Sequence, residues 1–178
     1  KKPKLKIGKY FMNETQIFQV LVSYLGRSEN DPELQKVFIE LGEKFPLKRP
    51  KSDETGYLLE DNKKKNRGFH LGVEYAETLP HLKDNTSYKE GELIFYSIQN
   101  IDKSKFEDTI FPFEISWSLT PETAKELLGN FFDYDEFWNA YLWEKENIII
   151  ILEFNDNNVL EDICFRVVVN DDLVFINI

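Results

Sequence analysis

The chain has 178 residues, of which 42% are hydrophobic and 15% aromatic, and its formal net charge is −10. At this length one ordinary domain buries roughly 70% of the surface that the unfolded chain exposes. The acidic charge disfavours binding to nucleic acid and to anionic membranes, because both attract Lys and Arg. It favours fast association with a basic protein, although a requirement for solubility explains the same charge.

The cysteine content and the apolar runs bear on the compartment. Cys164 is the single cysteine, so an intrachain disulfide is impossible, which fits a reducing, cytoplasmic location. The longest apolar run, Ile148–Leu152, is far shorter than the roughly 20 residues that cross a bilayer. We therefore expect a cytoplasmic protein that does not span a membrane.

Three stretches have the apolar spacing of amphipathic helices, namely 14–25, 32–41 and 121–128. The first ends before Gly26, a residue that tolerates the backbone conformation at a helix C-terminus. The second and the third each begin with a capping residue and a proline, Asp31–Pro32 and Thr120–Pro121.

Short strand-like segments separated by polar turns predict antiparallel meanders. They are 56–60, 69–75, 92–98, 111–119, 147–154, 159–169 and 173–178. In the segment 111–119, alternation places Phe113, Ile115, Trp117 and Leu119 on one face of the predicted strand. Because Ile148–Leu152 is apolar on both faces, its strand is expected in the interior of the sheet.

We therefore expect an α+β fold in which the three helices pack on one side of a largely antiparallel sheet. The chain is expected to be a single domain over 1–178, with the basic segment 1–13 as a tail or an edge segment. The halves 14–98 and 113–178 both run from helix to meander, with matching Pro-Glu pairs at Pro32 and Pro121. Duplication explains this pattern, and chance convergence of short capped helices explains it as well.

The sequence contains no recognisable catalytic or metal-binding motif. The two histidines, His70 and His81, do not stand at metal-ligand spacing to each other or to the cysteine. Cys164 lies in a predicted strand and is expected to be a packing residue. The stretch 155–162 has the composition of a calcium loop but lacks its central glycine and final glutamate. We expect no catalytic residues, no metal and no cofactor.

The stretch 129–143 is dense in aromatic and acidic side chains. A helix capped by Asp133 is one interpretation, and a strand that begins at Ala140 is the other; both predict that Trp138 is buried. The residues expected in the core are Phe131, Phe137, Trp138 and Tyr141. The residues expected to be exposed and to bind a partner are Asp133, Tyr134, Asp135 and Glu136. Tyrosine beside acidic residues suits docking onto a basic protein.

Several of these segments together resemble a protein family. They are the helix pair "LVSYLGRSENDPELQKVFIELG", the strands "GFHLGVEY" and "ELIFYSI", the Pro-aromatic segment "FPFEISWS", the Leu127–Gly129 helix end, Trp138, Tyr141 and the hairpin "IIIILEF…LEDICFRV". Over about 20–170 the chain resembles small bacterial immunity proteins of polymorphic-toxin and contact-dependent growth inhibition systems. The resemblance implies a cytoplasmic protein without catalytic residues that binds one cognate toxin, and it transfers no binding residue.

Three functions remain open at this point. The first is a stoichiometric inhibitor that covers the active site of a basic toxin, such as a nuclease. The second is a cytosolic adaptor or chaperone-like module with another protein client. The third, an enzyme of an unrecognised type, lacks support from any motif.

Overall fold

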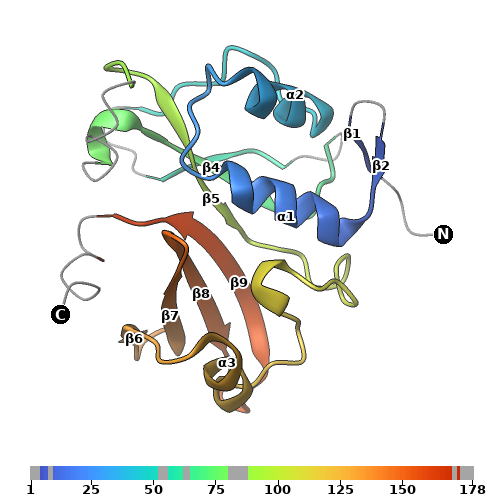
Figure 1. Cartoon of the computed structure of the whole chain (residues 1–178), viewed down its shortest axis with the longest axis vertical. Coiled ribbons are helices and arrows are strands. Elements are labelled where there is room, and N and C mark those ends of the chain that lie inside the picture. The colour runs from blue at the N-terminus through green and yellow to red at the C-terminus, as the bar shows by residue number, and fades with distance from the viewer. Residues whose placement is uncertain are drawn as a thin grey trace.

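The computed structural model describes residues 5–7, 10–51, 56–61, 65–79, 88–169 and 172 (Figure 1). Within them, the α-helices are α1 (Glu14–Tyr24), α2 (Pro32–Glu40) and α3 (Pro121–Leu128). Each helix agrees with its predicted range to about one residue at either end. The described residues include no helix with the length and apolar character needed to cross a membrane.

The described strands form a small sheet and a large one, and the predicted strand 173–178 lies outside the described residues. The small sheet pairs β1 (Leu5–Ile7) with β2 (Tyr10–Met12), within the segment predicted as a tail or an edge. The large sheet has seven strands in the order β3-β4-β5-β9-β8-β7-β6, and every pairing is antiparallel. Its strands are β3 (Tyr57–Leu59), β4 (His70–Tyr75), β5 (Leu93–Gln99), β6 (Asp133–Asp135), β7 (Ala140–Lys145), β8 (Ile148–Phe154) and β9 (Leu160–Val167).

The large sheet consists of two meanders that meet at a narrow seam. β5 and β9 pair at two positions, Ser97 with Arg166 and Ile98 with Phe165, and then diverge (Figure 1). Beyond the seam, the connection between α1 and α2 takes the place of β9 beside β5. In that connection, the Gly26 amide donates to the Phe95 carbonyl oxygen at 2.8 Å. Both halves run from helix to meander, and their origin by duplication remains a hypothesis.

The predicted helix starts are confirmed by their hydrogen bonds. The Asp31 carboxylate accepts from the backbone N–H groups of Glu33 and Leu34 at the start of α2. The Thr120 hydroxyl and the Thr123 side chain form a reciprocal capping box at the start of α3. These bonds satisfy amides that have no partner within the helix.

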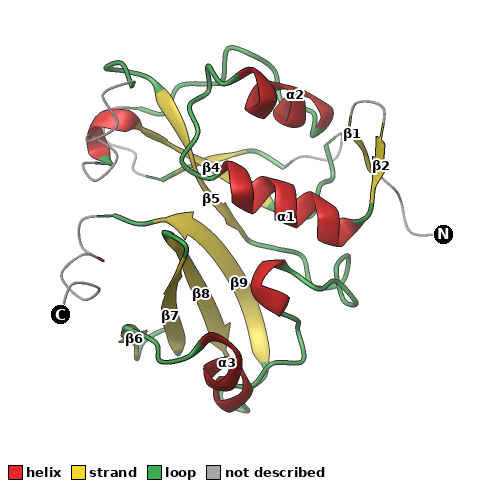
Figure 2. Ribbon diagram, viewed as in Figure 1, coloured by secondary structure: helices red, strands yellow, loops and turns green. Residues whose placement is uncertain are grey.

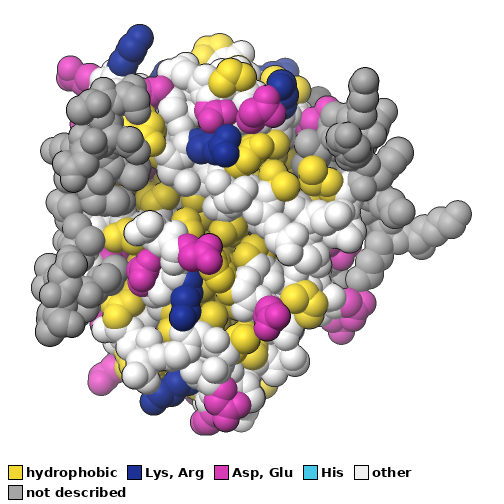
Figure 3. Space-filling view, in the orientation of Figure 1, with side chains coloured by type: hydrophobic (Ala, Val, Ile, Leu, Met, Phe, Trp, Pro, Cys, Tyr) yellow, Lys and Arg dark blue, Asp and Glu magenta, His cyan; other side chains and the backbone are white. Residues whose placement is uncertain are grey.

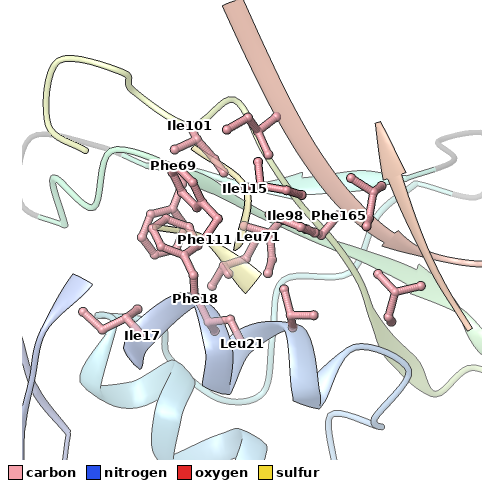
Figure 4. Packing of buried hydrophobic residues seen from close by; sticks show 14 of the residues in the cluster. Ile17, Phe18, Leu21, Phe69, Leu71, Ile98, Ile101, Phe111, Ile115 and Phe165 are labelled. Carbon is pink, nitrogen blue, oxygen red and sulfur yellow. The ribbon is translucent and has the colours of Figure 1, made fainter. Parts of the chain in front are cut away.

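The helices pack on one side of the large sheet, as predicted (Figure 2). One buried apolar cluster contains side chains from all three helices and alternate side chains of the strands. At its centre, the Phe18 ring of α1 lies 4.8 Å from the Phe111 ring and 5.2 Å from the Phe69 ring, between centroids (Figure 4). In β8, Ile150 faces this cluster and Ile149 is buried on the opposite face, which confirms an interior strand.

The prediction of a strand over 111–119 is wrong. The segment forms a 3₁₀ turn, η3 (Pro112–Glu114), in which Phe113 and Glu114 have positive φ angles. Pro112 has no N–H to give to a ladder, and this backbone conformation ends any extended pairing. Ile115 and Trp117 are nevertheless buried. The alternating pattern therefore predicted the burial of these two residues correctly but their secondary structure incorrectly.

Candidate functional site

The aromatic and acidic stretch forms a hairpin and not a helix. β6 pairs with β7 in antiparallel register, and a turn over 136–139 connects them. Within the turn, the Asp135 carboxylate accepts hydrogen bonds from the Phe137 amide at 2.9 Å and the Trp138 amide at 3.2 Å. Asn139 completes the turn with a φ angle of 47°, a conformation that asparagine tolerates well. The alternative that begins a strand at Ala140 is confirmed.

Phe137 and Trp138 lie outside the core, which contradicts our prediction. The exposed fraction is 84% for Phe137 and 58% for Trp138, and the two rings meet edge to face with centroids 4.9 Å apart. Helical spacing suggested a common face with Tyr141, but the turn projects both rings beyond the end of the sheet. Phe131 and Tyr141 are half-buried and pack against the main core, so they are core residues only in part.

The structure brings the four predicted partner-binding residues together on this hairpin. Asp135 and Glu136 are exposed, Tyr134 is 38% exposed, and Asp133 is half-buried. Asp133 and Asp135 belong to one face of β6, and Tyr134 belongs to the other. The Tyr134 hydroxyl hydrogen-bonds to Asn139 Oδ1 at 2.9 Å, so its ring is held against the turn.

The hairpin is anchored to the body of the protein on its apolar side. The Tyr134 ring stacks at a tilt on the Tyr141 ring, with centroids 4.6 Å apart. The indole N–H of buried Trp143 donates to the Gly129 carbonyl oxygen at 2.8 Å, which ties β7 to the end of α3. The exposed rings therefore stand on a structured base, and a partner would order few side chains when it binds them.

The side chains of this surface are of the kinds that bind other proteins. Large exposed aromatic side chains on a protein surface mark interaction sites, and tryptophan and tyrosine are frequent hot-spot residues. The sequence signal that could have located the site is "DEFWN", in which an aspartate and an asparagine suited to a tight turn bracket the aromatic pair.

A pocket of about 510 Å³ in the other half of the chain carries two buried glutamates, Glu29 and Glu92. Glu29 pairs with Arg49, and its carboxylate accepts from the Leu93 amide at 3.1 Å. Burial raises the pKa of Glu92. Hydrogen bonds from Ser28, the Lys89 amide and Asn30 lower it by more, so the pKa of Glu92 lies below its usual value. Through these contacts both carboxylates hold the loops around the pocket together.

Within the ranges that the structure describes, the other reactive side chains do not gather into a second site. Burial raises the pKa of the Cys164 thiol to about 12, so at neutral pH it is a protonated packing residue. His70 is half-buried in β4, and His81 lies outside the described residues. In the described part of the chain, no three His, Cys, Asp or Glu side chains converge in a way that could hold a metal ion.

Comparison of the chain with family models, with curated proteins and with solved structures gave no match. A function for this chain therefore has to be inferred from its own sequence and surface.

Proposed function

We propose that the chain is a stoichiometric immunity protein of the cytoplasm. It binds one cognate toxin domain, which is basic, and covers its active site; a nuclease is the kind of toxin that we expect. The exposed Phe137–Trp138 pair on the acidic β6–β7 turn is the observation that carries the proposal. The role requires no catalytic residue, no metal and no cofactor.

Physical reasons favour this turn as the docking element. Fully burying a large apolar side chain contributes about 1.5–3 kcal/mol, so two exposed rings supply a useful part of the affinity. The turn is closed by the hydrogen bonds of Asp135, so little conformational entropy is lost when the rings dock. The net charge of −10 accelerates the encounter with a basic protein.

Charge is distributed unevenly over the molecule. On the face shown in Figure 3, Lys and Arg side chains stand beside Asp and Glu. By contrast, the stretch 129–145, which contains the hairpin, has four acidic residues and one lysine, Lys145, at the end of β7 away from the turn. A basic partner is therefore attracted to the hairpin more strongly than to a surface of mixed charge.

Growth protection tests the proposal. The chain is coexpressed with the toxin domain of a large secreted protein encoded beside it, and we expect it to restore growth and to copurify with the domain at one to one. The double variant Phe137→Ser/Trp138→Ser should lose both effects. Ile39→Ser is the matched control, because Ile39 is 56% exposed on α2 in the other half of the chain.

Salt dependence provides a second measurement on the same complex. Raising the salt from about 50 to 500 mM should slow association strongly and change dissociation less, because screening acts mainly on exposed charges. Full protection by the double variant would contradict the role of the turn. If the chain binds a neighbouring gene product that is not toxic, the alternative of a cytosolic adaptor or chaperone-like module is favoured.

A further inference from the structure

A second turn lies beside the aromatic turn at the same end of the sheet. It connects β8 to β9 over 155–159, and β7 and β8 separate it from the aromatic turn along the chain. The Phe154 amide donates to the Asn139 carbonyl oxygen at 3.1 Å. The Asn139 side-chain amide donates to the Phe154 carbonyl oxygen at 2.9 Å and to that of Asn155 at 3.4 Å. Asn139 thus closes one turn and attaches it to the next.

The second turn is internally bonded and also presents an apolar side chain. The Asn155 side-chain oxygen accepts from the amides of Asn157 at 2.9 Å and Val159 at 3.0 Å. The Asn155 amide donates to the Val159 carbonyl oxygen at 3.0 Å, and Asn158 has a φ angle of 60°. Val159 is 45% exposed at the end of this turn. A β-branched side chain loses little entropy when it docks, so Val159 is suited to contact a partner.

A row of carboxylates on neighbouring strands runs from one turn toward the other. Asp135 stands opposite Ala140 in β7, Ala140 opposite Glu153 in β8, and Glu153 opposite Asp162 in β9. Burial raises the pKa of Glu153, and the negative charges of Glu161 and Asp135 raise it further, so these two carboxylates repel that of Glu153. A cation from outside would relieve that repulsion.

Cations of this chain are scarce around the two turns. The stretch 129–144 has four acids, the stretch 148–165 has four more, and neither contains Lys or Arg. Two lysines approach from other elements. Lys103 donates to the Leu160 carbonyl oxygen at 2.9 Å, and Lys125 lies 5.9 Å from the centroid of the Phe131 ring. Among the described residues, neither lysine forms an ion pair with a carboxylate of the two turns.

We infer that the two turns form one binding surface, and that its occupant is a protein with an apolar recess bordered by Lys and Arg side chains. This two-turn surface consists of Phe137, Trp138, Val159, Asp135, Glu136, Glu153, Asp156 and Glu161. The inference rests on the proposed function and extends its site to β8 and β9. An apolar centre with a rim of single charge is the arrangement by which a complementary basic surface is selected and oriented.

The test uses the toxin domain against which the chain protects. Val159→Arg and Asp156→Lys are made separately, because each adds a cation to the second turn without touching the first. Each should weaken binding at least about tenfold in calorimetric titration, as expected when a contact at a charged interface becomes repulsive. Ile110→Arg is the matched control, since Ile110 is 47% exposed and lies outside both turns. It should bind as the wild type does.

The outcomes separate this inference from the proposed function. If the second-turn variants bind as the wild type does while Phe137→Ser/Trp138→Ser loses binding, the two-turn surface is wrong and the proposed function stands. If Ile110→Arg weakens binding as much as Val159→Arg does, the effect is one of net charge and the inference also falls. If no toxin domain binds the wild type, both proposals fall. An unchanged thermal midpoint is required of every variant that is scored.

Discussion

Of two aromatic clusters in this chain, one is buried and the other is partly exposed. Around Phe18, the rings of Phe69, Phe106 and Phe111 are buried between α1, the sheet and the loops that follow β5 (Figure 4). In the β6–β7 hairpin, buried and half-buried rings form the base, but the turn carries two rings out of the protein. Aromatic density alone therefore does not predict burial. What decides is whether a second layer of structure lies over the segment.

The comparison also extends to charge. In the first half, buried Arg67 pairs with Glu43, which accepts from Lys65 as well at 2.7 Å. In the second half, Asp162 and Glu153 stand opposite each other on neighbouring strands, with like charge. The second half also pairs Arg166 with buried Asp172, so the difference is local: Glu153 and Asp162 are like charges that an external cation would stabilise.

The largest effect is expected from removing a ring of the closed cluster. Phe18→Ala should lower the free energy of unfolding by about 3–5 kcal/mol, because it leaves a cavity among three other rings. Urea denaturation measures this change. A loss below about 1 kcal/mol would mean that the first cluster is no better packed than the second.

The next effect concerns the charge difference. Burial, and then the charge of Glu153, raise the pKa of Asp162 from 3.8 to about 6, although backbone hydrogen bonds oppose this. The folded state then holds the Asp162 proton more tightly than the unfolded state does. This carboxylate therefore destabilises the fold above about pH 6 and ceases to do so below about pH 4. Asp162→Asn should raise the free energy of unfolding by about 2 kcal/mol at pH 7.5.

The pH dependence provides the internal control for Asp162. At pH 4 the variant and the wild type should have the same free energy of unfolding, because the aspartate is protonated in the folded state. Denaturation curves at the two pH values give the comparison. An equal gain at both would assign the effect to packing and not to charge.

A smaller effect is expected from opening the aromatic turn. Asp135→Ala removes the acceptor for the amides of Phe137 and Trp138 and should cost about 1 kcal/mol, as the loss of a capping side chain does. Asp135→Asn keeps an acceptor oxygen and should recover most of that loss. Amide exchange at Phe137 and Trp138 reports the opening directly, and unchanged protection in Asp135→Ala would argue against this hydrogen-bond geometry.

The smallest effect separates folding from binding. Trp138→Ala should change the free energy of unfolding by less than about 0.5 kcal/mol, because the ring is largely exposed. Thermal melts measure this, with the core variant Trp143→Ala as the contrasting case. A loss of several kcal/mol in Trp138→Ala would remove the distinction between the two clusters.

The sequence was informative where the signals are local. Asp31 and Thr120, each followed by proline, locate two helix starts, and the side chains cap as expected. Alternating and apolar runs located most of the strands. The segment 111–119 failed because positive φ angles at Phe113 and Glu114 leave no trace in an alternating pattern. Strand order could not be predicted, since pairing β5 with β9 joins residues far apart along the chain.

The candidate site was predictable in part. Asp133, Tyr134, Asp135 and Glu136 were selected as a contact patch and lie on one hairpin, three of them exposed. The spacing of Phe137 and Trp138 fits a helix face as well as a turn, and the hydrogen bonds of Asp135 decide between them. The proximity of Val159 depends on tertiary hydrogen bonds to Asn139, for which periodicity gives no signal.

The narrow seam between β5 and β9 has a consequence for how the chain opens. Two residue pairs connect the meanders, whereas the β8–β9 pairing extends from Ile148–Val167 to Phe154–Leu160. Fluctuations that separate the meanders therefore break few ladder bonds, and the Gly26–Glu29 connection keeps part of β5 paired when they do. Side chains of the shared apolar cluster, more than backbone hydrogen bonds, therefore hold the two meanders together.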